Sequence, residues 1–250
     1  MNFIAIIPAR FASTRFRGKP LVLIKGKPMV INVYERAIKV FDTVYIATDD
    51  ARIFNAAKKH DAKVVMTKKK HKSGTDRCAE AIDLIEKQEN REFNVVVNIQ
   101  GDEPFIFAEQ LLQIKKCFKS KKTEIATLVK MINNLEDIIN PNKPKVVVNK
   151  KDEAIYFSRS IIPYVRGVKK EKEWINKHKF YKHIGLYAFR RDILTEITKL
   201  PQSNLELAES LEQLRWLENG YKIKVAFTEY ENISIDTPKD LEDIKQLKLL

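Results

Sequence analysis

Cysteine, glycine and long apolar segments are scarce in this chain of 250 residues, which has 2 cysteines and 7 glycines. Cys78 and Cys117 form neither a Cys-x-x-Cys motif nor a disulfide framework, so we expect partly buried packing residues in a reducing cytoplasm. No apolar stretch approaches the roughly 18 to 20 residues of a membrane span. The first apolar run lacks a preceding cationic region and ends at Pro8, which argues against a signal peptide. We therefore expect a cytoplasmic protein with no membrane partner.

Several catalytic and phosphate-binding signatures are also missing. The sequence contains no Gly-x-Ser-x-Gly elbow and no His-Glu-x-x-His, which disfavours serine hydrolases and zinc proteases. No Gly-x-Gly-x-x-Gly follows the first apolar run, and Gly18-Lys19 lacks both the upstream glycine and the trailing hydroxyl residue of a P-loop. A phosphate-binding loop in this chain must therefore use side chains as well as backbone.

The chain is basic, with a formal net charge of +13. Clustered lysine and arginine side chains could neutralise a nucleic-acid backbone. However, the basic runs at 68–72, 119–122, 150–151 and 169–170 are scattered and rich in lysine, and they are not interleaved with stacking aromatic residues. They are typical of a solvated surface, so we expect no nucleic-acid partner.

Short apolar runs alternate with segments of helical periodicity through the first half of the chain. Strand-like runs occur at Phe3–Ile7, Val44–Ala47, Lys63–Met66, Val95–Ile99 and Ile125–Val129, and helices fit Met29–Val40, Ala51–Lys59, Asp76–Lys87 and Ala108–Lys119. This alternation predicts an α/β fold in which a mostly parallel, mixed sheet is flanked by helices in a Rossmann-like arrangement.

The pattern loosens after about residue 133. Strand-like runs follow at Lys145–Val148, Ile184–Phe189 and Lys222–Phe227, an amphipathic helix fits Leu205–Leu217, and a terminal helix runs to about Leu249. The segment Glu171–Lys182 is polar and weakly patterned. Because nothing in the length demands two domains, we expect one domain over residues 1–250, in which about 133–190 form a sub-region.

Four cations follow the first strand in the loop Pro8–Pro20, namely Arg10, Arg15, Arg17 and Lys19, with the hydroxyl of Ser13 among them. Ligands of open α/β sheets bind beyond the carboxyl ends of the strands. Arginine forks and lysine ammonium groups both suit phosphate oxygens. The sequence therefore predicts a polyanion site in this loop, and the alternative is a basic surface loop.

Two aspartates have the placement of metal ligands. Asp102 follows the strand-like run Val95–Ile99, and Asp236 precedes a helix that starts at a proline. Mg²⁺ prefers few carboxylates together with substrate phosphates, so this pair facing a cationic loop suits a nucleotide triphosphate complex. Taken singly, each aspartate is equally typical of a turn or a helix N-cap.

Other polar segments offer contacts for a nucleotide or a polyol. Ser73 and Arg77 lie at a helix start, which suits an anion or the polar edge of a base, or else a local cap and ion pair. Arg159 suits a carboxylate, while His183, Tyr187, Glu212 and Gln213 suit several hydroxyls. A single histidine beside a strand and a Glu-Gln pair on a helix are equally typical of purely structural roles.

Taken together, these segments resemble the 3-deoxy-manno-octulosonate (Kdo) cytidylyltransferases, which have the nucleotide-diphospho-sugar transferase fold. The match spans nearly the whole chain and is carried in order by Ile7-Pro8-Ala9-Arg10 through Gly18-Lys19-Pro20, Ser73-Gly74-Thr75-Asp76-Arg77, Asn98-Ile99-Gln100-Gly101-Asp102-Glu103-Pro104, Tyr156-Phe157-Ser158-Arg159, His183-Ile184-Gly185-Leu186-Tyr187, Leu211-Glu212-Gln213-Leu214 and Asp236-Thr237-Pro238.

The resemblance implies a Mg²⁺-dependent transfer of CMP from CTP to the anomeric hydroxyl of Kdo, with release of pyrophosphate, for lipopolysaccharide assembly. It implies that Arg10, Lys19, Asp102 and Asp236 are the catalytic residues and that the two aspartates bind the metal. It implies that the nucleotide contacts Ala9, Arg10, Ser13, Arg15, Lys19, Ser73, Arg77 and Gln100. It implies that the sugar acid contacts Gln100, Arg159, His183, Tyr187, Glu212 and Gln213.

One position departs from the family pattern, because Arg17 stands where a proline usually precedes the loop glycine. Its side chain either contacts the leaving phosphates or projects into water, and we favour water. The nearest rival substrates are sialic acid and 8-amino-Kdo, and a more distant alternative is a nucleotide or nucleic-acid binding module without turnover. Family members commonly form homodimers, and the stretch after Asn133 is where we expect such an interface.

Overall fold

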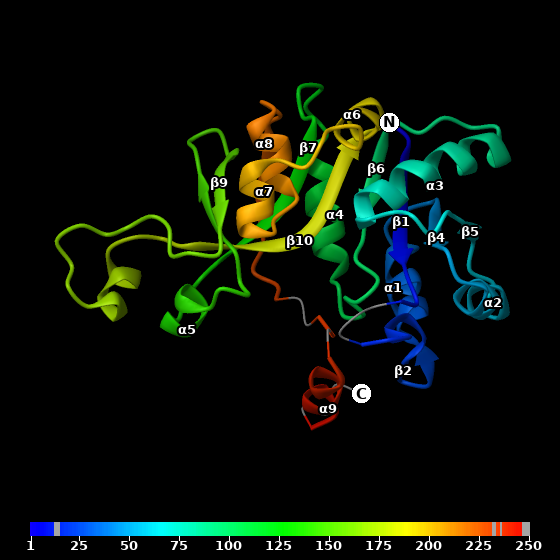
Figure 1. The fold of residues 1–250 in the computed structure, drawn as a ribbon, viewed down its shortest axis with the longest axis horizontal. Helices are drawn as coiled ribbons and strands as arrows, with labels where there is room; N and C mark the ends of the chain where they lie inside the picture. The colour runs from blue at the N-terminus through cyan, green and yellow to red at the C-terminus, as the bar shows by residue number, and fades with distance from the viewer. Residues whose placement is uncertain (13–15, 232–233, 236, 247–250) are drawn as a thin grey trace. The chain divides into compact units, whose positions relative to one another are not determined.

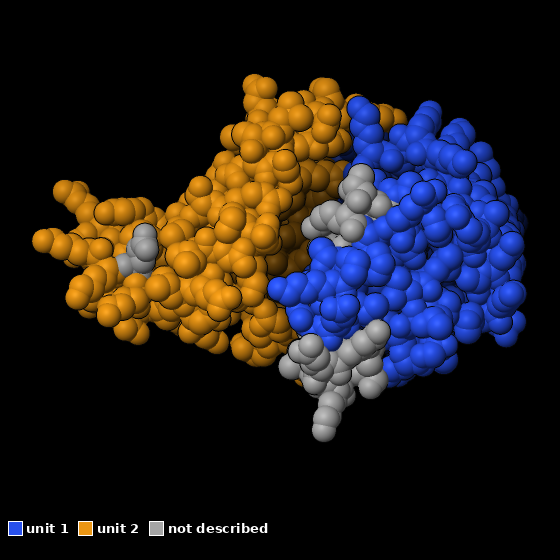
Figure 2. All heavy atoms as spheres, turned by 60° about the horizontal axis from the view of Figure 1, so that its bottom comes forward, with its two compact units in different colours: residues 1–112, 189–198, 232–250 blue, residues 113–188, 199–231 orange. Residues whose placement is uncertain are grey.

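The computed structural model describes residues 1–12, 16–231, 234–235 and 237–246 (Figure 1). The chain forms two compact units, which Figure 2 colours separately. Unit 1 comprises Met1–Leu112, Phe189–Thr198 and Asn232–Leu250, and unit 2 comprises Gln113–Ala188 and Lys199–Glu231. The expected sub-region at 133–190 belongs to unit 2 except for its last two residues. Compactness alone does not decide whether the units fold as one domain, so that expectation stays a prediction.

Unit 1 is built on parallel strands in the order β6-β1-β4-β5. The strands are β1 (Phe3–Ala9), β4 (Val44–Thr48), β5 (Val64–Met66) and β6 (Val95–Asn98), with a small hairpin of β2 (Leu23–Ile24) and β3 (Lys27–Pro28). The helices are η1 (Lys19–Leu21), α1 (Met29–Ala37), α2 (Ala51–Lys59), α3 (Gly74–Glu89), α6 (Arg191–Ile197) and α9 (Pro238–Gln246), and α4 (Ala108–Cys117) begins in this unit.

The central strands of unit 1 are buried over most of their length. Ile4 to Ile7 of β1 and Val95 to Val97 of β6 are fully inaccessible to solvent. Strands covered by helices on both faces have this continuous apolar character. Helices α1, α2 and α3 pack against β1, β4, β5 and β6 and hold the sheet in place. The polar side chains of the candidate site lie in the loops that follow the carboxyl ends of these strands.

Unit 2 is a mixed arrangement of strands. Strand β11 (Ile223–Phe227) runs parallel to β7 (Ile125–Met131), and β8 (Lys145–Val148) runs antiparallel to both β9 (Ala154–Ser158) and β10 (Tyr181–Arg190). Its helices are α5 (Leu135–Ile139), η2 (Glu171–Asn176), α7 (Asn204–Glu209) and α8 (Gln213–Glu218). The predicted α/β fold with a mostly parallel, mixed sheet is confirmed.

One predicted helix is wrong. The expected helix Leu205–Leu217 consists of α7 and α8, because Ser210 adopts a left-handed conformation with φ of 51° and ends α7. Strand β10 also begins earlier than expected, at Tyr181. Lys182 lies in the segment Glu171–Lys182, which its polar residues kept out of the predicted strand. Its side chain is nevertheless buried, and its ammonium contacts Asp137 Oδ2 at 2.6 Å. An ion pair thus places a lysine inside a strand that hydropathy alone did not predict.

Two further features bear on the composition. Within the described part of the chain, no helix combines the length and the apolar character needed to cross a bilayer. Cys78 is buried and Cys117 is half-buried, and neither forms a disulfide, as expected for packing residues. Burial raises the pKa of Cys117 to about 11, so this thiol is protonated near neutral pH.

Candidate active site

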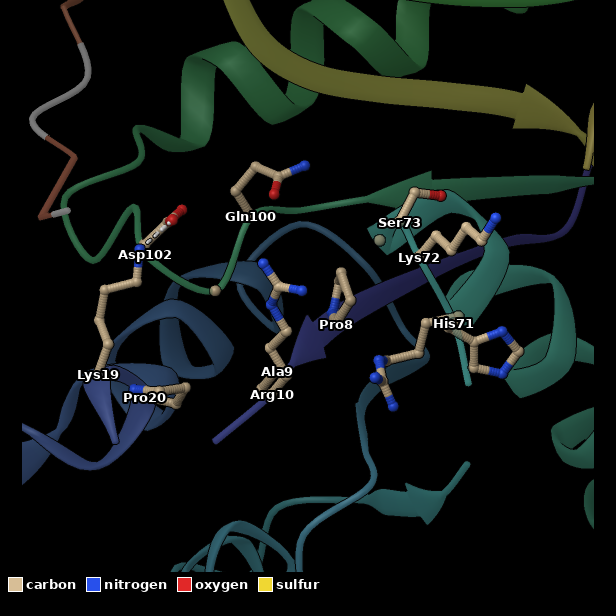
Figure 3. A pocket seen from close by; sticks show the side chains of 13 residues that line it. Pro8, Ala9, Arg10, Lys19, Pro20, His71, Lys72, Ser73, Gln100 and Asp102 are labelled. Atoms are coloured by element: carbon tan, nitrogen blue, oxygen red, sulfur yellow. Dashed lines mark hydrogen bonds and ion pairs between the residues drawn. The ribbon is translucent and has the colours of Figure 1, made fainter. Parts of the chain in front are cut away.

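A pocket of unit 1 lies where two strands end and one helix begins (Figure 3). Strands β1 and β6 run parallel with Ile6 opposite Asn98, so the segments that follow them leave the same edge of the sheet. The first turn of α3 supplies the remaining wall. The cavity has a volume of about 260 Å³ and is lined by Pro8, Ala9, Arg10, Lys19, Pro20, His71, Lys72, Ser73, Gly74, Arg77, Gln100, Gly101 and Asp102.

Two glycines allow the walls of this pocket to approach Pro8. A Cβ atom on Gly101 would lie 3.0 Å from the carbonyl oxygen of Pro8, and one on Gly74 would lie 3.2 Å from the proline ring. Such contacts are tighter than ordinary van der Waals packing, so side chains at these positions would push the loops away from β1. The glycines therefore set the spacing between the cationic loop, the Asp102 loop and α3.

An ion pair joins the loop after β1 to the loop after β6. Lys19 Nζ donates to Asp102 Oδ2 at 2.6 Å, and the side chains are 11% and 27% exposed, respectively. Gly18, with φ of 74°, turns the chain into η1, where Lys19 is the first residue. The predicted phosphate-binding lysine and the predicted metal-binding aspartate are therefore direct neighbours.

Arg10 lies at the solvent-exposed rim of the same pocket. Figure 3 shows its side chain extending from the end of β1 toward Gln100, which follows β6. Arg17 is exposed, and its guanidinium carbon lies 5.8 Å from the centroid of the Phe11 ring. This location agrees with the interpretation that Arg17 projects into water, while its role toward a ligand stays a prediction.

Ser73 and Arg77 both line the pocket. They also make the helix cap and the ion pair that the sequence allowed as alternatives to ligand binding. Ser73 and Asp76 form a capping box at the start of α3, in which each side chain bonds the backbone of the other residue. Arg77 is 3% exposed. Its Nη2 donates to Asp49 Oδ2 at 3.0 Å and its Nη1 donates to Thr67 Oγ1 at 2.6 Å. These contacts fix the α3 wall before any ligand binds.

His71 and Lys72 also line the pocket but were not predicted as site residues. Glu80 of α3 accepts hydrogen bonds from the backbone N–H of Lys68 and from the His71 ring. Burial raises the pKa of Glu80, but the hydrogen bonds from His71 and from the Lys68 backbone, together with the charges of these two residues, outweigh burial and keep the pKa below its ordinary value. Because Glu80 lies within α3, nine residues after His71, which precedes the helix, no local spacing rule identifies this pair.

Several of the predicted sugar-binding residues cluster in unit 2. The ring centroids of His183 and Tyr187 on β10 are 5.1 Å apart, and that of Trp216 on α8 is 5.1 Å from Tyr187. Burial, with a contribution from the charge of Glu212, raises the pKa of Tyr187 well above its ordinary value. Gln213 is 4% exposed, and its Nε2 donates to no acceptor within the described residues. The cluster therefore keeps a buried donor available.

Burial also sets the charge of His183. Its Nε2 lies 2.9 Å from the hydroxyl oxygen of Thr127, whose own hydroxyl donates to the Leu186 carbonyl at 2.8 Å. Desolvation lowers the pKa of His183 to about 3. The imidazole is therefore neutral near physiological pH and provides a hydrogen-bonding group, not a positive charge.

Arg159 follows β9 in unit 2 and contacts backbone carbonyls. Its Nε donates to Glu209 O at 2.7 Å, and its Nη1 donates to Pro141 O at 2.9 Å. These contacts hold the guanidinium on the end of α7 and on the turn at Pro141.

Comparisons with known proteins agree with this arrangement. Residues 4–223 match the family model described as cytidylyltransferase. The chain is 61% identical to a 3-deoxy-manno-octulosonate cytidylyltransferase of Parabacteroides distasonis over 97% of this chain and 96% of the relative. It is 59% identical to the enzyme of that name from Phocaeicola vulgatus over 96% of this chain and 95% of the relative. The chain belongs to the 3-deoxy-manno-octulosonate cytidylyltransferase family.

A solved structure extends this assignment to the whole fold. The structure of CMP:2-keto-3-deoxy-manno-octonic acid synthetase complexed with CTP is 38% identical to this chain. The two superpose with a TM-score of 0.89, over 100% of this chain and 99% of the other. The predicted membership of the Kdo cytidylyltransferase family and the predicted fold are therefore confirmed.

In this cytidylyltransferase, six of the predicted nucleotide-site residues line one pocket with Asp102, namely Ala9, Arg10, Lys19, Ser73, Arg77 and Gln100. Arg159, His183, Tyr187, Glu212 and Gln213 all belong to unit 2. Ser13, Arg15 and Asp236 lie outside the described residues. The ligands of all these residues stay predictions.

The donor set of the pocket fits a magnesium ion in this cytidylyltransferase. Asp102 is an oxygen donor that is partly exposed to the cavity, and Mg²⁺ takes one or two carboxylates plus substrate phosphates. The backbone N–H of Ile235 donates to the carbonyl oxygen of Asp102 at 3.0 Å. This bond ties Ile235 to the Asp102 loop. Groups of three or more histidine, cysteine, aspartate or glutamate side chains arranged for a metal are absent from the described residues.

Proposed function

We propose that this protein transfers CMP from CTP to the anomeric hydroxyl of Kdo, forming CMP-Kdo and pyrophosphate for lipopolysaccharide synthesis. The observation that carries the proposal is the single pocket that contains Arg10, Lys19, Gln100 and Asp102 at the ends of two parallel strands. The names of its relatives, and the CTP complex of the similar synthetase, support CTP and Kdo as the substrates.

The cations of the pocket would bind the triphosphate. Arg10 is exposed at the rim and Lys19 is nearly buried at the Asp102 side, so a bound triphosphate would meet positive charge at two depths. We propose that Ser13 and Arg15 extend this set, and that Ala9, Ser73, Arg77 and Gln100 seat the nucleotide. The Arg77 guanidinium is already paired with Asp49, so its contribution is to orient the α3 wall.

We propose that Asp102 and Asp236 hold Mg²⁺. When bound there, the ion would neutralise charge that develops on the phosphate oxygens. Asp102 would hold the metal through its carboxylate, and the Lys19 ammonium, which contacts Oδ2, would lie close to the bound phosphates. The ion pair keeps Lys19 and Asp102 side by side in the pocket that we assign to CTP.

The transfer step forms a bond between the anomeric oxygen and the α-phosphorus, and breaks the bond from that phosphorus to the leaving pyrophosphate. The hydroxyl proton is lost to water. Arg10 and Lys19 would hold the pyrophosphate in line with the attacking oxygen, and this alignment lowers the barrier without a covalent enzyme intermediate. Arg159, His183, Tyr187, Glu212, Gln213 and Gln100 would surround the sugar acid. Because His183 is neutral, it would hydrogen-bond to sugar hydroxyls.

We also propose that the protein is a cytoplasmic homodimer. Exposed apolar side chains within residues 133–190 support an interface there, since Ile139, Ile155 and Tyr164 are 50%, 56% and 73% exposed, respectively. Sedimentation velocity at several protein concentrations measures this state. A monomer at every concentration would exclude a stable dimer.

Pyrophosphate release tests the function. Each of CTP, UTP, ATP and GTP is combined with Kdo, 8-amino-Kdo or sialic acid in the presence of Mg²⁺. We expect release with CTP and Kdo, and little with the other pairs. Faster release with 8-amino-Kdo or sialic acid would change the sugar assignment, and no release with any pair would favour a binding module.

A further inference from the structure

Glu209, the last residue of α7, accepts hydrogen bonds from two consecutive residues at the end of β9. Ser158 Oγ donates to its Oε1 at 2.5 Å, and the backbone N–H of Arg159 donates to its Oε2 at 2.9 Å. The Arg159 side chain returns to the same residue, because Nε donates to the Glu209 carbonyl at 2.7 Å. Both carboxylate oxygens and the carbonyl of Glu209 therefore hold the position of Arg159.

The Arg159 guanidinium is fixed on one side and keeps donors for a ligand. Besides the bond to Glu209, its Nη1 donates to Pro141 O at 2.9 Å and its Nη2 donates to Ser210 O at 3.4 Å. A guanidinium has five N–H donors. Three are engaged by these carbonyls, so one N–H on each Nη remains without an acceptor among the described residues. A pair of terminal N–H groups is the geometry that binds a carboxylate through two bonds.

A buried lysine lies beside this arrangement. Lys145 of β8 is fully buried and pairs in register with Ser158 of β9. Its Nζ donates to the Asn140 carbonyl at 2.9 Å, one residue before the carbonyl that holds Arg159. Desolvation lowers the pKa of Lys145, the charge of Glu209 opposes that shift, and the charge of Arg159 adds to it. The three side chains interact as one cluster.

The charges of the cluster do not cancel. When Lys145 is protonated, the cluster contains two cations, Lys145 and Arg159, and one anion, Glu209. An uncompensated charge in a partly buried site is costly unless a counter-charge binds. A single carboxylate of a ligand would supply that counter-charge.

We propose that Glu209 and Lys145 are positioning residues for the carboxylate of the sugar-acid substrate. Glu209 holds the Arg159 guanidinium in one orientation, and Lys145 holds the turn at Asn140 and supplies the second positive charge. This inference rests on the proposed function, since it requires an acidic acceptor. It goes beyond the resemblance, which points to Arg159 but to neither of its neighbours.

Steady-state kinetics of E209Q tests the proposal, with E229Q as the matched control. Glu229 is an exposed residue of the same unit, so its amide variant makes the same chemical change away from the cluster. E209Q weakens the contacts of the carboxylate with Ser158 Oγ and with the backbone N–H of Arg159, and so shifts the residue that carries the guanidinium. We expect E209Q to raise the KM for Kdo about tenfold or more, while the KM for CTP stays within about twofold, because only sugar binding uses that guanidinium. E229Q should match the wild type. A general folding defect would lower the active fraction without separating the two KM values.

Two further variants keep the test decisive. S158A removes one of the bonds to Glu209 and should raise the KM for Kdo by a smaller factor, even if E209Q does not fold. K145M should also raise the KM for Kdo and leave that for CTP unchanged. If the wild type is active and both S158A and K145M keep its KM for Kdo, the inference is overturned but the proposed function stands. Wild type that releases no pyrophosphate with Kdo would overturn the proposed function and the inference together.

Discussion

The ammonium nitrogen of Lys19 lies 2.6 Å from Oδ2 of Asp102, although the two residues are 83 positions apart in the chain. Strand β1 carries the first and strand β6 the second to the same edge of the sheet. Because the Lys19 side chain is nearly buried, its positive charge needs a partner, and Asp102 supplies that negative charge when no nucleotide is bound. A metal complex of CTP would replace this internal contact with charges of its own.

Asp102→Asn should abolish most turnover while the protein stays folded. The amide keeps the size of the side chain but loses the charge that we assign to the metal and to Lys19. We expect kcat/KM to fall by about 10²-fold to 10³-fold, the range found when an enzyme loses one group that stabilises charge in its transition state. Pyrophosphate release across a Mg²⁺ titration measures it, and the Mg²⁺ requirement should rise.

Asp42→Asn is the control for this substitution. Asp42 is exposed in unit 1, so its amide variant should retain full activity and the same Mg²⁺ requirement. An Asp102→Asn variant with an unchanged Mg²⁺ titration would contradict the assignment of Asp102 as a metal ligand.

Sequence patterns predicted the elements that carry the pocket, because each is locally encoded. The apolar runs at Phe3–Ile7 and Val95–Ile99 are buried strands, and Ser73 caps a helix through a residue three positions later. Contacts between distant segments were not predictable in this way. Arg77 pairs with Asp49 across 28 residues, and His71, which precedes α3, contacts Glu80 within that helix. The left-handed conformation of Ser210, which ends α7, was also not predictable, since a serine does not by itself mark the end of a helix.

Gly101→Ala should impair nucleotide binding. The added Cβ would lie 3.0 Å from the Pro8 carbonyl oxygen, so the Asp102 loop or the end of β1 must shift. We expect the free energy of unfolding to fall by about 1–3 kcal/mol, as in other overpacked sites, and the KM for CTP to rise. Urea unfolding and steady-state kinetics measure the two effects.

Gly167→Ala separates backbone strain from the clash at the pocket. Gly167 has φ of 86° and open space around its Cα, so alanine there adds strain but no contact. This variant should lose some stability and keep the wild-type KM for CTP. If Gly101→Ala behaves the same way, the spacing set by Gly101 is not needed for the nucleotide.

Alkylation should leave the enzyme active. Cys78 is buried, and burial raises the pKa of Cys117 to about 11, so neither thiol offers a reactive thiolate at pH 7.5. After treatment with iodoacetamide under native conditions, mass spectrometry should find both cysteines unmodified, and pyrophosphate release should be unchanged. Rapid inactivation that a C78A/C117A variant escapes would show that one of these thiols is accessible and contributes to activity.

His183 should make the protein less stable as the pH falls below the ordinary pKa of histidine. Burial lowers the pKa of His183 to about 3, whereas the unfolded chain takes up the proton near pH 6.5. Between these values the unfolded state binds more protons, so stability decreases by about 1.4 kcal/mol per pH unit. Between pH 6.5 and 5 the loss is about 2 kcal/mol. Urea unfolding at pH 7, 6 and 5 measures this loss of stability.

His183→Gln should flatten the dependence of stability on pH, whereas His60→Gln, at an exposed position, should retain it. An equal slope in both variants would mean that His183 is protonated in the folded state.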